Sequence, residues 1–263
     1  MNKSEKGGLA VVTGASSGIG VAYADRLAAR GHPLLLVARR AAKLKEVADT
    51  LSARHGVKVE TLVADLEDAA DLRKLEDRLK SDPVAILVNN AGAGGLGPSA
   101  KSTADQMERI IRLNITSLTR LSHAALEGFR ARGTGVLINI ASIIALAPSE
   151  AGAVYGGSKA YVLNFSRSLQ LEYAKSDIKI QVVLPGPIRT EFFAAQGMDD
   201  SIFPDHTYLT PEQLVDAALS GLDAGEKITH PTLSDIETWH SLEAARKKYM
   251  AEVFVGQVAP RYL

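Results

Sequence analysis

The chain has 263 residues, and its 30 lysines and arginines balance its 30 aspartates and glutamates. A net charge of zero argues against a nucleic-acid partner, which usually requires a basic excess or stripe. The absence of cysteine excludes disulfides, thiolate metal sites and a cysteine nucleophile, and it suits a reducing cytoplasm. No apolar run approaches the roughly 20 residues of a membrane span, and the first residues lack the apolar stretch of a signal peptide. We therefore expect a cytoplasmic protein without a membrane partner.

Short apolar runs alternate with longer amphipathic stretches along the chain. In chain order, the expected strands are Leu9–Val12, Leu34–Val37, Val57–Val63, Ala85–Val88, Val136–Ile140 and Ile180–Leu184. The expected helices are Ala22–Arg30, Ala41–Arg54, Ala69–Lys80, Ala104–Arg130, Val154–Ala174, a helix that begins at Pro211 after a capping Thr210, and Ser234–Val253. This alternation predicts an α/β fold, in which a doubly wound parallel sheet of the Rossmann type carries helices on both faces.

No linker or composition break divides residues 1–263, so we expect a single domain. A stretch at about 187–210 has weaker periodicity, and a long segment beyond the carboxyl end of a strand commonly covers the ligand crevice of such a sheet. The apolar residues of this stretch, together with two that follow the fifth strand, indicate either an apolar substrate pocket or a small core of the segment's own. They are Phe192, Phe193, Met198, Ile202 and Phe203, with Ile143 and Ile144.

A glycine-rich turn follows the first expected strand and precedes a helix. It reads Thr13-Gly14-Ala15-Ser16-Ser17-Gly18-Ile19-Gly20. Glycines at such a turn allow positive φ and let backbone N–H groups approach a pyrophosphate at the helix N-terminus. The spacing is GxxxGxG and not the usual GxGxxG, so a plain strand-to-helix turn is the alternative interpretation.

The end of the second strand carries two arginines where an NAD site usually carries an acid, about 20 residues beyond the glycines. Arg39 and Arg40 follow Ala38, and the next acid is Glu46. Arg39 is able to form a bidentate contact with a 2′-phosphate, which favours NADP(H) over NAD(H). The alternative is that both arginines are simply solvated at a helix start.

Tyr155 and Lys159 lie four residues apart in an expected helix, so their side chains share one face. A phenol has a reference pKa of about 10, and a neighbouring ammonium is expected to lower it toward neutrality. Ser142, just past the fifth strand, is placed to bind the same reacting oxygen. Alone, a Tyr–Lys pair is as easily a surface pair that contributes little.

In their order and spacing, these motifs resemble the classical short-chain dehydrogenase/reductase family. The resemblance runs from about Leu9 to Thr190. It rests on TGASSGIG at Thr13–Gly20, NNAG at Asn89–Gly92, Asn114, Ser142, the pair of Tyr155 and Lys159, and Pro185-Gly186 with Thr190.

The resemblance implies a set of cofactor-binding residues. They are Gly14, Ser16, Ser17, Gly18, Ile19, Gly20, Arg39, Arg40, Asp65, Leu66, Asn90, Ala91, Gly92, Tyr155, Lys159, Pro185, Gly186, Ile188 and Thr190. Simpler interpretations stay open for three of them. Asn90 suits a turn that ends a strand, Asp65 suits a cap for the next helix, and Thr190 suits a helix N-cap.

The resemblance also implies the reaction, which is hydride transfer between NADP(H) and a carbonyl or alcohol substrate. Ser142 would hold the substrate oxygen, Tyr155 would transfer the proton, and Lys159 would tune Tyr155 and bind the nicotinamide ribose. The backbone at Asn114 would hold a water that links Lys159 to solvent; the alternative is an ordinary helix-interior residue. The family implies a homo-oligomer, a dimer or tetramer, through the helices that carry Asn114 and Tyr155. It does not fix the direction of the reaction.

Two observations qualify the resemblance. The VDGG pattern that ends many family members is missing, and this chain has Lys227–Pro231 followed by a helix. The six histidines show no ligand-like spacing, so we expect no metal site. A second function on the same fold is a non-catalytic NADP-binding sensor or scaffold. The presence of Ser142, Tyr155 and Lys159 argues against it, because a binding module needs no proton donor.

Overall fold

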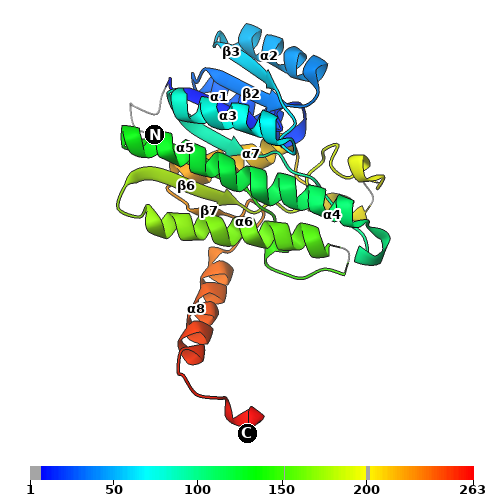
Figure 1. Cartoon of the computed structure of the whole chain (residues 1–263), viewed down its shortest axis with the longest axis vertical. Helices are drawn as coiled ribbons and strands as arrows, with labels where there is room; N and C mark the ends of the chain where they lie inside the picture. The colour runs from blue at the N-terminus through cyan, green and yellow to red at the C-terminus, as the bar shows by residue number, and fades with distance from the viewer. Residues whose placement is uncertain (1–6, 151, 200–201) are drawn as a thin grey trace. The chain divides into compact units, whose positions relative to one another are not determined.

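The structure is a computed structural model that describes residues 7–150, 152–199 and 202–263. It contains one seven-stranded sheet in the order β3-β2-β1-β4-β5-β6-β7, and every neighbouring pair is parallel (Figure 1). The strands are β1 (Leu9–Thr13), β2 (Leu34–Ala38), β3 (Val59–Val63), β4 (Val84–Asn89), β5 (Thr134–Ile140), β6 (Asp177–Val183) and β7 (Ile228–Thr229). The strand order reverses between β1 and β4, and sheets of this type bind ligands at such a switch point.

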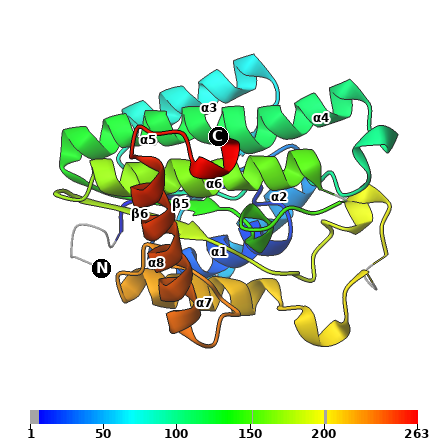
Figure 2. The same ribbon diagram turned by 90° about the horizontal axis from the view of Figure 1, so that it is seen from below.

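Helices cover both faces of the sheet, as two perpendicular views show (Figures 1 and 2). One face carries α1 (Gly18–Ala29), α2 (Ala41–His55) and α7 (Pro211–Asp223). The opposite face carries α3 (Ala69–Ser81), α5 (Leu118–Arg132) and α6 (Ala153–Glu172). This arrangement confirms the predicted doubly wound α/β fold.

The inner strands are largely buried on both faces, because helices cover the sheet on both sides. The edge strand β3, expected to be buried, is only partly so, and Val63 is 51% exposed. In β1, Ala10 and Val12 belong to the core beneath α1 and α7, whereas Val11 belongs to the core beneath α3 and α5. All five residues of β2 are buried. This explains why the strands appear in the sequence as continuous apolar runs and not as alternating patterns.

The helix expected over Ala104–Arg130 consists of three parts. They are α4 (Ala104–Ile111), a π-helical turn η2 (Arg112–Ser117) and α5. Two polar side chains of the turn, Asn114 and Ser117, bond to backbone outside the helix, and Ser117 Oγ donates to the carbonyl of Leu66 at 2.6 Å. π-helical turns are rare and often occur at functional sites.

The seventh strand is not among the predicted ones, because only two residues form it. Ile228 pairs with Val182 and Thr229 with Val183. The hydroxyl of Thr229 accepts a 2.9 Å hydrogen bond from the buried amide of Gln181. A two-residue strand carries no periodicity that a sequence pattern can reveal.

Residues 232–263 form a compact unit of their own, separate from the unit that ends at Pro231. It contains α8 (Ile236–Val253), which begins two residues later than predicted because Asp235 is its N-cap and accepts from Glu237 N. Throughout the described parts of the chain, every helix is too short or too polar to cross a membrane.

Candidate active site

The carboxyl ends of the strands open into a cleft of about 1100 Å³. Nearly all residues implied by the family resemblance line it. They are Gly14, Ser16, Ser17, Gly18, Ile19, Arg39, Arg40, Asp65, Leu66, Asn90, Ala91, Gly92, Ser142, Tyr155, Lys159, Pro185, Gly186, Ile188 and Thr190. Gly20 and Asn114 lie outside this lining.

The glycine-rich turn leaves open backbone at the start of α1. Gly18 has φ +52°, and a Cβ there would lie 2.8 Å from Thr190 Cγ2. A Cβ on Gly20 would lie 2.3 Å from the carbonyl oxygen of Gly14. Glycine therefore suits both positions, and Ser17, Gly18 and Ile19 at the start of α1 line the cleft. The first N–H groups of a helix have no partner within the helix and can bind a pyrophosphate. The turn therefore fits a dinucleotide.

Thr13 and Asn90 connect this turn to the end of β4. Thr13 Oγ1 accepts from the backbone N–H groups of Asn90 and Ala91, both at 3.0 Å. The side-chain amide of Asn90 donates to the carbonyl of Thr13 at 2.9 Å. Asn90 therefore does more than end a strand, because it links the end of β4 to the start of the glycine-rich turn. Sequence reasoning gave Thr13 no role beyond the motif.

The two arginines after β2 point to different neighbours. Arg40 donates through Nε and NH2 to Ser16 Oγ, at 3.2 and 3.1 Å, and so contacts the glycine-rich turn. The guanidinium of Arg39 lies 3.4 Å from a carboxylate oxygen of Glu67 and 3.8 Å from one of Asp65. The structure therefore places Arg40, more than Arg39, beside the turn that a 2′-phosphate would approach.

Asp65 is not the cap of the following helix. The N-cap of α3 is Asp68, whose side chain accepts from the N–H groups of Ala70 and Asp71. Asp65 instead accepts from Glu67 N at 3.0 Å, and this turn places Leu66 against the cleft. The alternative interpretation of Asp65 as a cap is wrong.

Lys159 is a buried cation on α6. Its side chain is 7% exposed, and its Nζ donates to the carbonyl of Ile140 at 2.9 Å. Burial lowers the pKa of Lys159 to about 8, because removing water from an ammonium favours its neutral form. The amine lies 5.7 Å from the centroid of the Tyr155 ring.

Tyr155 lies one helical turn before Lys159, as the sequence predicts. Burial raises the pKa of Tyr155 to about 12, and a hydrogen bond with the Ser142 hydroxyl lowers it by less than burial raises it. The shift is opposite in direction to the predicted lowering of the pKa. Burial removes the water that would solvate the phenolate, and this loss outweighs the stabilisation that the nearby Lys159 amine gives to the phenolate. The phenol is therefore fully protonated at neutral pH and suited to donate a proton.

Ser142 follows β5 and caps a 3-10 turn, η3 (Ile143–Ala145). Its hydroxyl accepts from Ile144 N and donates to the carbonyl of Pro185, both at 3.4 Å. These long bonds are weak. The hydroxyl therefore remains available to Tyr155 and to an oxygen placed between them.

Asn114 is held firmly although it does not line the cleft. Its Oδ1 accepts from Ala93 N at 2.8 Å, and its Nδ2 donates to the carbonyl of Ala93 at 2.9 Å and to Ser158 Oγ at 3.0 Å. A Cβ on Gly92 would lie 3.3 Å from Asn114 Oδ1 and 3.7 Å from Lys159 Nζ. Asn114 is thus not an ordinary helix-interior residue, and it lies close to Lys159 behind the Gly92 backbone.

Thr190 is not a helix N-cap, because the next helical turn, η4 (Ala194–Gln196), has Phe193 at its N-cap. The Thr190 hydroxyl instead accepts from Phe192 N at 3.2 Å within a turn. Thr190 also packs beside Gly18 and so lies against the glycine-rich turn. Upstream, the Pro185 carbonyl accepts from Ile143 N at 3.0 Å. Ile188 pairs with Leu209 in an isolated bridge, so the two ends of the stretch at 187–210 lie side by side.

The stretch at 187–210 is called here the covering segment. Its apolar residues form a small core of their own and also line the cleft, so both interpretations of them apply. Phe193 packs edge-on against Phe203 and Tyr208, with ring centroids 6.0 and 6.1 Å apart, and forms a small core. Phe192 lies 5.6 Å from the Tyr155 ring, and Phe192, Phe193 and Phe203 all line the cleft. Gln196, which sequence reasoning missed, attaches the segment to the opposite wall by accepting from Leu96 N at 3.0 Å.

No group of three or more histidine, aspartate or glutamate side chains is placed to hold a metal ion within the described ranges of the chain. Three arginines of the cleft lining pair with carboxylates of the same lining: Arg39 and Arg109 with Glu67, and Arg40 with Glu191.

The comparisons with known proteins agree with this geometry. The family model described as short chain dehydrogenase matches residues 8–200. A short-chain dehydrogenase from Sphingobium yanoikuyae, solved in complex with NADPH, is 43% identical, with a TM-score of 0.93 over 97% of this chain and 100% of that one. A bulky-bulky ketone specific alcohol dehydrogenase from Comamonas testosteroni is 37% identical, with a TM-score of 0.89 over 98% of this chain and 99% of that one.

Among curated proteins, a very-long-chain 3-oxoacyl-CoA reductase from Danio rerio is 36% identical over 215 residues, which is 80% of this chain. The match spans only 66% of that longer relative. The family model alone covers most of this chain, including the glycine-rich turn, Ser142, Tyr155 and Lys159. The chain therefore belongs to the short-chain dehydrogenase family of oxidoreductases.

Proposed function

We propose that this protein is an NADP(H)-dependent carbonyl reductase or alcohol dehydrogenase that acts on bulky, apolar ketones or the matching alcohols. The observation that carries this proposal is the meeting of Ser142, Tyr155 and Lys159 in one cleft, with Phe192 beside the Tyr155 ring. A bound nicotinamide cofactor supplies the hydride. The protein's own residues bind the reacting oxygen and move the proton.

The proton moves through Tyr155 in this proposal. In the reductive direction, the Ser142 hydroxyl donates to the carbonyl oxygen of the substrate and orients it toward the Tyr155 phenol. The phenol is protonated at neutral pH, and it transfers its proton to that oxygen as hydride reaches the carbon. Lys159 holds a positive charge close by, which stabilises the phenolate left behind. Asn114 and the Gly92 backbone position Lys159 and the water that returns a proton.

The preference for NADP(H) rests on the arginines after β2. Positions 39 and 40 after β2 are arginines, whereas an NAD site usually carries an acidic residue there to bind the ribose hydroxyls. Arg40 and Ser16 form a donor pair beside the glycine-rich turn, and guanidinium groups bind phosphate through paired hydrogen bonds. The relative from Sphingobium yanoikuyae is solved with NADPH, which supports the same cofactor for this chain.

The proposed substrate class rests on the apolar part of the cleft. Ile143, Ile144 and Phe192 line it beyond Tyr155. Ile143 remains 46% exposed, so a bound apolar group would remove a large surface from water. The Comamonas testosteroni relative is named for bulky-bulky ketones, which supports this class.

A substrate panel tests the proposal. NADPH oxidation is followed by absorbance with small aldehydes, aliphatic ketones, aryl ketones that carry two large groups, and the matching alcohols with NADP+. We expect turnover that rises with the size of the apolar groups. Tight NADPH binding without turnover of any compound would favour the non-catalytic sensor or scaffold. Turnover of small polar aldehydes alone would contradict the proposed substrate class.

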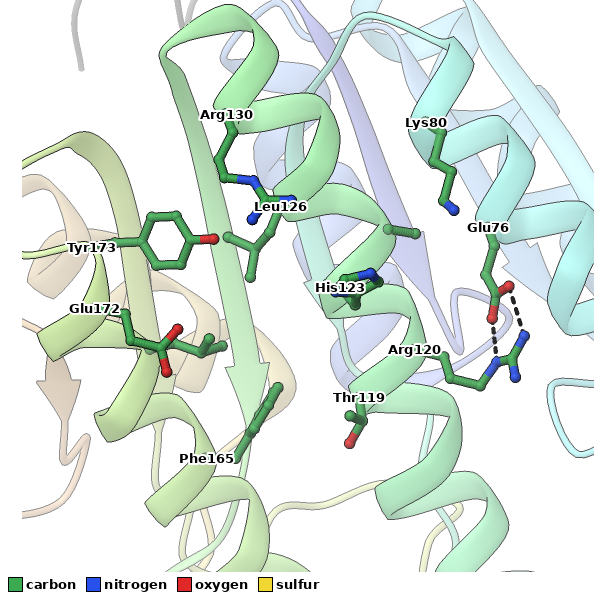
Figure 3. Close-up of a pocket in the computed structure, with 12 residues that line it drawn as sticks. Glu76, Lys80, Thr119, Arg120, His123, Leu126, Arg130, Phe165, Glu172 and Tyr173 are labelled. Atoms are coloured by element: carbon green, nitrogen blue, oxygen red, sulfur yellow. Dashed lines mark hydrogen bonds and ion pairs between the residues drawn. The ribbon is translucent and has the colours of Figure 1, made fainter.

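We also propose that the protein acts in the cytoplasm as a homo-oligomer built on the outer faces of α5 and α6. A groove of about 560 Å³ lies there (Figure 3), between Arg120 and His123 of α5 and Phe165 of α6. Light scattering should give a mass above the 28.0 kDa of one chain. The change His123→Asp, which adds negative charge to the groove, should release monomers. An unchanged mass would contradict assembly through this face.

A further inference from the structure

Glu191 links the covering segment to the cationic start of α2. It follows Thr190 directly, and its Oε2 accepts from Arg40 NH1 at 2.6 Å while its Oε1 accepts from Lys43 Nζ at 2.7 Å. The same Arg40 donates to Ser16 Oγ in the glycine-rich turn. One guanidinium is therefore shared between an internal carboxylate and the turn that the proposed function assigns to the 2′-phosphate.

The carboxylate of Glu191 is a permanent anion. Its hydrogen bonds from Lys43 and then from Arg40 lower its pKa to about 2. At any pH at which the enzyme works, Glu191 therefore carries a full negative charge. A second anion that approaches Arg40 and Lys43 meets this charge at the same donors.

We propose that Glu191 is a cofactor-specificity residue, which occupies Arg40 and Lys43 as an internal anion and is displaced by the 2′-phosphate of NADP(H). The proposal rests on the function above, because it takes the cofactor to be NADP(H). A phosphate monoester carries a charge of about −1.5 to −2, so it outcompetes one carboxylate for two cations. NAD(H) has only hydroxyls at this position and leaves the Glu191 contacts in place.

The consequence is that Glu191 weakens the discrimination that Arg40 and Lys43 alone would provide. Binding of NADP(H) has to break two ion pairs, whereas binding of NAD(H) breaks neither. The side chains of Arg40, Lys43 and Glu191 are 42%, 49% and 52% exposed. Exposed pairs of this kind add little to folding, so removing the carboxylate should leave the fold intact and change binding alone.

Isothermal titration with NADPH and NADH tests the inference on the wild type and on Glu191→Gln. We expect the Kd for NADPH to fall about three- to tenfold in Glu191→Gln, the range that one or two exposed ion pairs support. The Kd for NADH should change by less than about twofold, since no phosphate competes there. Glu212→Gln is the matched control, because it removes an exposed carboxylate from the first turn of α7 and should change neither value.

An unchanged ratio of the two Kd values in Glu191→Gln would overturn the inference. A weaker affinity for NADPH would also overturn it, because Glu191 would then be holding the cations in place for the phosphate. In the background of Arg40→Ala with Lys43→Ala, the same change should have no effect. A persistent gain there would reveal a general charge effect and reject the specific competition.

These outcomes are separate from a failure of the proposed cofactor. If the wild type binds NADH as tightly as NADPH, the preference for NADP(H) is wrong. The role of Glu191 is judged only by the change in the ratio between wild type and Glu191→Gln. The NADP(H) preference can therefore be wrong while the role of Glu191 holds, and the reverse is also possible.

Discussion

The Nζ of Lys159 donates a 2.9 Å hydrogen bond to the carbonyl of Ile140, the last residue of β5. An amine of α6 is thus held at the carboxyl end of β5 beside the cleft, and burial lowers the pKa of that amine to about 8. At neutral pH the amine remains charged despite its burial. Such a site costs stability and has a use only if the charge serves the reaction.

Replacing Lys159 by methionine should make the protein more stable. The pKa of about 8 in the folded protein lies below the ordinary 10.5, so the unfolded chain binds more protons between these two values. The wild type therefore gains stability as pH rises from 8 to 10.5, and burial of the ammonium is most costly below pH 8. We expect Lys159→Met to raise the free energy of unfolding by about 1–2 kcal/mol at pH 7.

Urea unfolding at pH 7 and at pH 10 measures this effect. The advantage of Lys159→Met should shrink at the higher pH, where the wild-type amine is largely neutral. If Lys159→Met is less stable than the wild type at pH 7, the hydrogen bond to Ile140 outweighs the cost of burying the charge, and the account of this site is wrong.

The rate of ketone reduction should fall as pH rises above about 8. The ammonium of Lys159 is lost there, whereas Tyr155, with a pKa of about 12, keeps its proton through the whole working range. Lys159, and not Tyr155, should therefore set the alkaline limit of kcat/KM in the free enzyme. A pH profile of kcat/KM that stays flat to pH 9.5 would contradict this assignment.

Replacing Asn114 by alanine should lower both stability and turnover. Three hydrogen bonds to Ala93 and Ser158 are lost, and buried partners that lose a hydrogen bond cost about 1–3 kcal/mol. We expect kcat to fall at least about tenfold, because a shift of the π-helical turn moves the surroundings of Lys159. Thermal unfolding and steady-state rates measure both effects.

Asn164→Ala is the control for this change, because Asn164 lies on α6 with an exposed side chain. It should leave stability and kcat close to their wild-type values. Equal effects of the two substitutions would remove the reason to assign Asn114 to the reaction.

Gly18→Ala should weaken cofactor binding at least about tenfold, as expected for a turn that must approach a phosphate closely. The new Cβ would lie 2.8 Å from Thr190 Cγ2, and the alanine would have to keep the φ of +52° that Gly18 has. Gly31→Ala is the control, because Gly31 has φ +85° but no heavy atom within 4 Å of its would-be Cβ. Both variants share the backbone strain, so equal Kd values for NADPH would show that the collision with Thr190 has no effect.

Much of the fold could be predicted, because long periodic segments carry a clear signal. Six of the seven strands and the helices on both faces follow from apolar runs and helical periodicity. The π-helical turn at Asn114 could not, since the residues around it continue the same amphipathic pattern. The second unit, residues 232–263, likewise has no composition break at its start.

The parts of the candidate site that could be predicted are those where a motif requires one residue type at a fixed position. Gly18 and the spacing of Tyr155 and Lys159 are of this kind. The contacts of Arg40, Glu191 and Gln196 could not be predicted, because side chains far apart in sequence meet only after the covering segment folds over the cleft. The pKa of Tyr155 was predicted in the wrong direction, since burial is a property of the folded structure and outweighs a nearby charge.

The most direct test of the account is the rate of hydride transfer in Tyr155→Phe with NADPH already bound. Single-turnover mixing with the best ketone of the substrate panel follows the loss of reduced cofactor, and the Kd for NADPH is measured on the same sample. Tyr161→Phe makes the same change on the same helix, where Tyr161 bonds to Thr119 at 2.8 Å, and should keep its activity. We expect Tyr155→Phe to lose at least about a thousandfold in rate, within the range of a lost general acid, with NADPH affinity within about threefold of the wild type. An unchanged rate in Tyr155→Phe would contradict the role of this phenol as the proton donor.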